Sequence, residues 1–123
     1  GIGGWGSKMS AGVFSKNTFQ EQPEMVSIFE RLFEAQEPSS YIRSIEVLLG
    51  ADVTSIVPTV KVPCMAIAGT EDSYAPPDSV KEFISKIPGG CRQENIQNNA
   101  HMVFLETPEM FAEIVEEFLE KLN

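Results

Sequence analysis

The chain has 123 residues, 42% of them hydrophobic and 22% charged, which is a composition typical of one globular domain with a core. With 18 acidic residues against 9 basic ones, its formal net charge is −9. Because that charge repels phosphate groups, we expect neither nucleic acid nor an anionic membrane surface as a partner. No apolar run reaches the ~20 residues that a membrane span needs, and the first residues do not resemble a signal peptide.

The two cysteines, Cys64 and Cys91, fall in different expected elements and lack the Cys-x-x-Cys spacing of a metal or redox site. Together with a single histidine, they do not supply the ligands of a standard zinc site. We therefore expect no metal and no cofactor. Both cysteines are interpreted as small, buried apolar residues of a protein in a reducing compartment, the cytoplasm.

Part of the acidic surplus lies near the C-terminus, at positions that we assign to helix faces. We interpret these glutamates as a solvated face that keeps the protein in solution, with a docking patch for a basic partner as the alternative. They are Glu106, Glu109, Glu113, Glu116, Glu117 and Glu120.

The first half of the chain is predicted to be helical after an irregular start. Residues 1–22 are rich in Gly, Ser, Lys and Gln, and we expect only a short helix there, near residues 8–13. From Pro23 on, apolar residues recur at helical spacing, and a second amphipathic helix follows Pro38 and ends near Gly50. Both helices have wide apolar stripes, so we expect both to pack on something.

The second half alternates strands and helices. Residues 62–69 form a continuous apolar run, which predicts a strand buried on both faces of a parallel sheet. A helix over 77–87 and a weaker strand over 91–97 follow, and Thr107 is expected to cap a final helix that starts at Pro108. This order predicts an α/β fold with two neighbouring parallel strands.

Two ionisable residues follow these strands. Asp72 lies in the loop after the first strand and His101, the single histidine, lies in the loop after the second. Since the carboxyl ends of parallel strands lie at the same edge of a sheet, an Asp–His hydrogen bond is geometrically reasonable. Taken alone, Asp72 is explained as a turn residue and His101 as a surface or packing residue. It is their occurrence together, in loops after consecutive strands, that favours a functional pair.

These loops resemble a known family. Gly69-Thr70-Glu71-Asp72, Pro76-Pro77, His101 and the run 104–111 look like the C-terminal part of α/β-hydrolases, in the subgroup of enol-lactonases, esterases, C–C bond hydrolases and cofactor-free haloperoxidases. The resemblance implies that Asp72 is the triad acid and His101 the base. It also implies a partial α/β-hydrolase fold of two parallel strands with covering helices, in which residues 1–56 are a helical cap-like segment and 57–123 the C-terminal βαβα part of the core.

The chain departs from that family in two places. Asn98-Asn99-Ala100 stands where the family has Gly-x-Gly before the base, although Asn tolerates left-handed backbone angles. The nucleophile motif Gly-x-Ser-x-Gly does not occur; the nearest match surrounds Ser10, which lacks the first Gly and a preceding strand. The triad thus lacks its nucleophile, and we expect the chain alone to be close to inert toward esters.

Three functions remain open. The first is the C-terminal portion of a serine-type α/β-hydrolase that acts on a carboxylic ester, a lactone or a related small carbonyl substrate once complemented. The second is a non-catalytic dimerisation or partner-binding domain derived from such an enzyme, and the third is a βα domain that resembles the family by accident. The chain lacks an initiator Met, so we expect it to have been processed, tagged or cut from something longer. A homo-oligomer or a missing N-terminal half is expected to cover the edge of the first strand.

Overall fold

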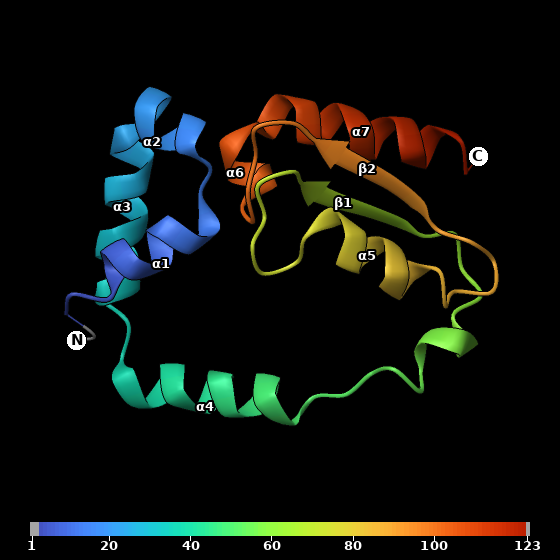
Figure 1. Ribbon diagram of the computed structural model, residues 1–123, viewed down its shortest axis with the longest axis horizontal. Coiled ribbons are helices and arrows are strands. Elements are labelled where there is room, and N and C mark those ends of the chain that lie inside the picture. Colours follow the sequence, from blue (N-terminus) through green and yellow to red (C-terminus); the bar gives the residue numbers. More distant parts are fainter. Residues whose placement is uncertain (1–2, 123) are drawn as a thin grey trace.

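The computed structural model describes residues 3–122 and contains short helices packed around a small parallel sheet (Figure 1). The predicted α/β class is confirmed. In chain order the elements are α1 (Gly6–Val13), α2 (Lys16–Glu21), α3 (Pro23–Glu34), α4 (Pro38–Gly50), the 3-10 turn η1 (Val57–Thr59), β1 (Met65–Gly69), α5 (Pro77–Ile84), β2 (Arg92–Ile96), α6 (Val103–Glu106) and α7 (Pro108–Glu120).

Prolines mark the beginnings of the longer helices, as predicted. The helices α3, α4, α5 and α7 each begin at a proline, whose missing N–H would have no helical partner in the first turn in any case. The expected side-chain cap of α7 is wrong, however. Thr107 occupies the capping position, but its hydroxyl donates to Asn99 Oδ1 at 2.8 Å instead of accepting from the helix.

Two short helices were not predicted. The helix α2 has six residues and α6 has four, which is too few for an apolar repeat to be visible in the sequence. Local hydrogen bonds define α2, because the Ser15 hydroxyl caps it by accepting from the backbone N–H of Thr18 at 3.2 Å.

The sheet consists of β1 and β2, which pair in parallel with Met65 opposite Arg92 and Gly69 opposite Ile96. The connecting helix α5 and the final helix α7 lie on opposite sides of the strands (Figure 1). The expectation that β1 is buried on both faces holds only for its end, where Ala68 and Gly69 are buried and the first three residues are half-buried. Within residues 3–122, β1 has a strand neighbour on one edge alone.

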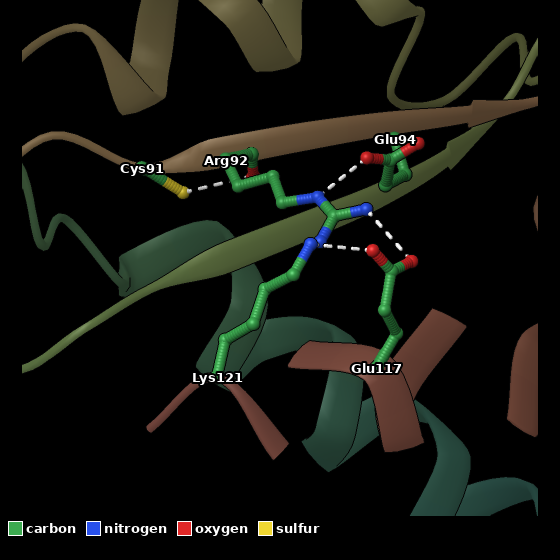
Figure 2. Close-up of polar contacts among 5 residues, drawn as sticks. All are labelled: Cys91, Arg92, Glu94, Glu117 and Lys121. Atoms are coloured by element: carbon green, nitrogen blue, oxygen red, sulfur yellow. Dashed lines mark hydrogen bonds and ion pairs between the residues drawn. The ribbon is translucent and has the colours of Figure 1, made fainter. Parts of the chain in front are cut away.

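Charged side chains join α7 to the sheet. The Arg92 guanidinium on β2 donates to Glu94 at 2.6 Å and to Glu117 on α7 at 3.2 Å, and Lys121 binds the same Glu117 carboxylate (Figure 2). Together, Lys121 and Arg92 hold the pKa of Glu117 below its usual value. Because these groups are half-buried to exposed, we expect the contacts to orient α7 more than to stabilise it.

The N-terminal helices pack on the far end of the chain through an apolar cluster. Val13, Phe14 and Val26 are buried there, and the rings of Phe14 and Phe29 meet edge to face with centroids 5.1 Å apart. Met102, which directly follows His101, packs against the same cluster. This contact brings a segment from the start of the chain beside the loop after β2.

The helix α4 differs from the other long helices. Its Tyr41 ring meets the Phe33 ring of α3 with centroids 5.2 Å apart, yet no residue of α4 is buried. Its apolar side chains Ile42, Val47, Leu48 and Leu49 are exposed. Within residues 3–122, the expected packing of this helix is thus limited to a few partly buried side chains, and most of its apolar stripe has no cover. Figure 1 shows α4 lying apart from the sheet, followed by a long connection that leads to β1.

The two cysteines are closer together than their spacing in the sequence suggests. Cys64 and Cys91 each directly precede a strand, so the register places them side by side, and both line an apolar groove with residues of α5. They are free and only partly buried, which corrects the expectation of full burial. Burial and the neighbouring Cys64 thiol raise the pKa of Cys91. In the described part of the chain, no helix is both long and apolar enough to cross a membrane.

Candidate active site

The loop after β1 holds Asp72 in a tight turn. One carboxylate oxygen, Oδ1, accepts hydrogen bonds from the backbone N–H groups of Tyr74 at 2.8 Å and Ala75 at 3.0 Å. The turn role considered for Asp72 is therefore real, but it uses only this oxygen. The residue is 8% exposed, so its second oxygen, Oδ2, requires a partner inside the protein.

That partner is His101, from the loop after β2. Its Nδ1 lies 2.9 Å from Asp72 Oδ2, and the Tyr74 ring packs edge to face against the imidazole with centroids 5.4 Å apart. The structure thus brings together the two site residues that the sequence predicts. A carboxylate at Nδ1 favours the tautomer with hydrogen on that nitrogen, which leaves the Nε2 lone pair to accept a proton. The His101 side chain is 42% exposed, so the ring is accessible from solvent.

Burial alone would raise the pKa of Asp72, but hydrogen bonds to its charged form outweigh burial. The N–H of Ala75, the His101 ring and the N–H of Tyr74 all favour the carboxylate, so the pKa of Asp72 lies below its ordinary value. Asp72 is therefore ionised at neutral pH.

The two loops meet because the strands end in register and approach very closely. Backbone N–H groups cross between them, from Thr70 to Ile96 O at 3.0 Å and from Glu71 to Asn99 O at 2.8 Å. A Cβ at Gly69 would lie 2.1 Å from the carbonyl oxygen of Ala100, which is a severe clash with backbone. Glycine is required here by this close approach of the two chain segments.

The turn before His101 forms without the glycines of the family pattern. Asn98 has a φ of 56°, the left-handed conformation that Asn was expected to tolerate. Its N–H donates to the Thr70 hydroxyl at 3.1 Å, which ties the turn to the Asp72 loop. Ala100 has no positive φ, so a Cβ is acceptable at this position.

A third carboxylate, Glu106, corrects the expectation of a wholly solvated acidic face. Glu106 is 3% exposed, and its carboxylate accepts from the N–H of Ser15 at 2.8 Å, the hydroxyl of Thr18 at 2.6 Å and the N–H of Ala100 at 2.7 Å. No local pattern predicts this burial, because two of the three donors, Ser15 and Thr18, lie about 90 residues earlier in the chain. The other five glutamates of that face, Glu109, Glu113, Glu116, Glu117 and Glu120, are exposed as predicted.

Ser10, the nearest match to a nucleophile motif, lies in the middle of α1 and is fully buried. Its hydroxyl is 2.5 Å from Glu30 Oε1 and 3.1 Å from the carbonyl oxygen of Ser7, so it serves a helix–helix contact. Across residues 3–122, no group of three or more potential metal ligands comes together.

Solved structures with the same fold identify the class. Over 98% of its length the chain superposes on a thermophilic esterase from Thermogutta terrifontis (TM-score 0.89, 21% identity) and on the enol-lactonase from Burkholderia xenovorans LB400 (TM-score 0.89, 23% identity). It covers 44% and 45% of those chains, about half their length. The chain therefore has the fold of the C-terminal part of an α/β-hydrolase, as the resemblance of its loops predicted.

Residues 3–122 match the family of PhoPQ-activated pathogenicity-related proteins, and the chain belongs to this family. A stretch of 87 residues, 71% of the chain, is 30% identical to the polyketide synthase ThaQ of Burkholderia thailandensis. The chain spans only 4% of that curated relative.

Proposed function

We propose that this chain is the acid–base end of a serine-type α/β-hydrolase that acts on a carboxylic ester, a lactone or a related small carbonyl compound. The observation that carries the proposal is the 2.9 Å contact between His101 Nδ1 and Asp72 Oδ2 at the carboxyl edge of two parallel strands. The names of the superposed structures, an esterase and an enol-lactonase, support this substrate class.

The pair performs proton transfer in this proposal. A serine hydroxyl from outside these residues attacks the carbonyl carbon while His101 Nε2 takes its proton, and Asp72 stabilises the imidazolium. The same proton then passes to the leaving oxygen, which departs and leaves an acyl-serine. Water attacks the acyl group in the second half of the reaction, again losing its proton to His101, and the serine hydroxyl is restored. The chain alone has no nucleophile motif and is proposed to be inactive.

The uncovered surface near the Asp72–His101 pair supports the proposal that another protein segment binds this chain. The free edge of β1 and the apolar groove between β1 and α5, lined by Met65, Val80 and Phe83 among others, are not covered within residues 3–122. We propose that a parallel strand from the N-terminal part of the fold extends the sheet there, with residues 1–56 acting as the cap segment. A second copy of the chain is the alternative occupant.

A non-catalytic role as a dimerisation or partner-binding domain is the second candidate. The exposed apolar side chains of α4 favour it, because Leu48 and Leu49 are 69% and 83% exposed and a contiguous apolar surface is a common interface feature. A stable homodimer that does not hydrolyse activated esters would support this candidate over the hydrolase.

The proposal is tested first in the gene and then in the protein. The reading frame, or a companion gene, is expected to encode a segment with Gly-x-Ser-x-Gly that precedes this chain in the fold. The complete protein is expected to hydrolyse p-nitrophenyl esters, and His101→Ala should lower kcat/KM by about 10⁴-fold. Glu109→Gln, which removes an exposed charge, serves as the control. Absence of such a segment, or a fully active His101→Ala variant, would overturn the proposal.

A further inference from the structure

The Glu106 carboxylate joins two segments that are far apart in the sequence. Its Oε2 accepts from the N–H of Ser15 at 2.8 Å and from the hydroxyl of Thr18 at 2.6 Å, both at the start of α2. Its Oε1 accepts from the N–H of Ala100 at 2.7 Å, in the loop after β2. One side chain thus connects the N-terminal helices to the residue that directly precedes His101.

These hydrogen bonds account for the burial of a charged group. In the described range 3–122 no cationic side chain forms an ion pair with Glu106, and the residue is 3% exposed. A buried carboxylate without a counter-ion depends on its hydrogen-bond donors, and charge-assisted bonds of this kind are about twice as strong as neutral ones. Loss of the negative charge therefore weakens all three contacts together.

The same loop has a second attachment to the N-terminal helices. The N–H groups of His101 and Met102 both donate to the carbonyl oxygen of Val13, at 3.0 and 3.1 Å. Glu106 holds the backbone at Ala100, one residue earlier. Three consecutive N–H groups, from residues 100 to 102, are thus fixed to two anchors, and these fix the direction in which the His101 side chain leaves the backbone.

We propose that Glu106 is a positioning residue, which fixes the His101 loop to the N-terminal helices and thereby keeps the imidazole directed at Asp72. A role of Glu106 in catalysis rests on the hydrolase function proposed above, whereas its role in maintaining the Asp72–His101 contact does not. Glu106 itself is buried, with both carboxylate oxygens occupied by these donors, and takes no proton in the reaction.

The test compares Glu106→Gln with Glu109→Gln in the 123-residue chain by NMR. Both variants remove one negative charge from neighbouring positions, but only Glu106 is buried. Glutamine keeps one acceptor oxygen and directs its amide donors at the groups that formerly donated. We expect amide hydrogen exchange at Ala100 and His101 to accelerate roughly ten- to a hundredfold in Glu106→Gln. We also expect the Nδ1–H resonance of His101 to broaden or disappear, while Glu109→Gln leaves both signals unchanged.

A milder variant keeps the test informative where Glu106→Gln does not fold. Thr18→Val removes one donor and preserves side-chain shape, so we expect a change in the same direction, severalfold in the exchange of Ala100. Folded variants with wild-type exchange and a wild-type Nδ1–H signal would overturn the proposal, even where their Tm is lowered, since Glu106 would then be structural only. Neither readout needs a nucleophile, so a complete protein that fails to hydrolyse esters would contradict the proposed function and not this inference.

Discussion

The end of the molecule that carries Asp72 and His101 differs from its flank, formed by α4 and the groove between β1 and α5. At the site end polar groups are buried and paired: Asp72 and Glu106 each have several donors, and no buried side-chain polar atom of the described residues lacks a partner. At the flank, apolar groups are exposed: Val47 on α4 is 71% exposed, and within residues 3–122 no strand lies beside the free edge of β1.

The two regions differ in whether their groups already have partners: the polar groups of the site end do, and the apolar groups of the flank do not. A buried polar group without a hydrogen-bond partner is costly. Since the buried polar groups of the site end have partners among the described residues, we expect this end to form with these residues alone. Exposed apolar stripes on a helix and an open strand edge are typical of surfaces that another segment covers. The acid–base pair is therefore expected to be assembled in this chain, before any companion binds.

The largest effect is expected at Gly69. Gly69→Ala places a methyl group 2.1 Å from a backbone oxygen of the His101 loop, so one loop must move. We expect a loss of about 3 kcal/mol in the free energy of unfolding, measured by urea denaturation. Gly89→Ala is the matched control, because a Cβ there meets nothing within 4 Å. Equal effects of the two substitutions would show that the loops are not held in close contact.

Two valines compare the buried and exposed helices directly. Val26 on α3 is 5% exposed and Val47 on α4 is 71% exposed. We expect Val26→Ala to cost about 2 kcal/mol in the free energy of unfolding, whereas Val47→Ala stays within about 0.5 kcal/mol. A large effect of Val47→Ala that grows with protein concentration would mean that a second copy of the chain already covers α4.

The smallest of these effects concerns pH. The pKa of Asp72 is lowered in the folded chain, so its contribution to stability is present above the unfolded value near 4 and is lost as the pH falls through the folded value. At neutral pH we expect Asp72→Asn to be less stable than the wild type, and the difference to shrink as the pH falls through the lowered pKa of Asp72. Thermal unfolding at a series of pH values measures it, and a difference that grows in acid would contradict the lowered pKa.

Much of the fold was predictable because it depends on local signals. Proline starts and helical apolar repeats located α3, α4, α5 and α7, and the apolar run located β1. The meeting of Asp72 and His101 followed from a general rule, since parallel neighbouring strands end at one edge.

The features that the sequence did not reveal depend on tertiary contacts that no local pattern encodes. Glu106 was grouped with the exposed glutamates of α7, and its donors at residues 15, 18 and 100 distinguish it from them. Thr107 looked like a helix cap because the competing acceptor, Asn99, is eight residues away. The exposure of α4 could not be predicted either, because an apolar stripe predicts that a helix packs but does not identify the surface on which it packs.

The central claim is that the acid–base pair exists in this chain alone, and proton NMR of the His101 imidazole tests it most directly. At neutral pH the wild-type chain is expected to show a downfield Nδ1–H resonance protected from solvent exchange, because Asp72 Oδ2 accepts that hydrogen. Asp72→Asn is expected to lose this charge-assisted signal. A wild-type chain without the resonance, or an Asp72→Asn variant that retains it unchanged, would contradict the account.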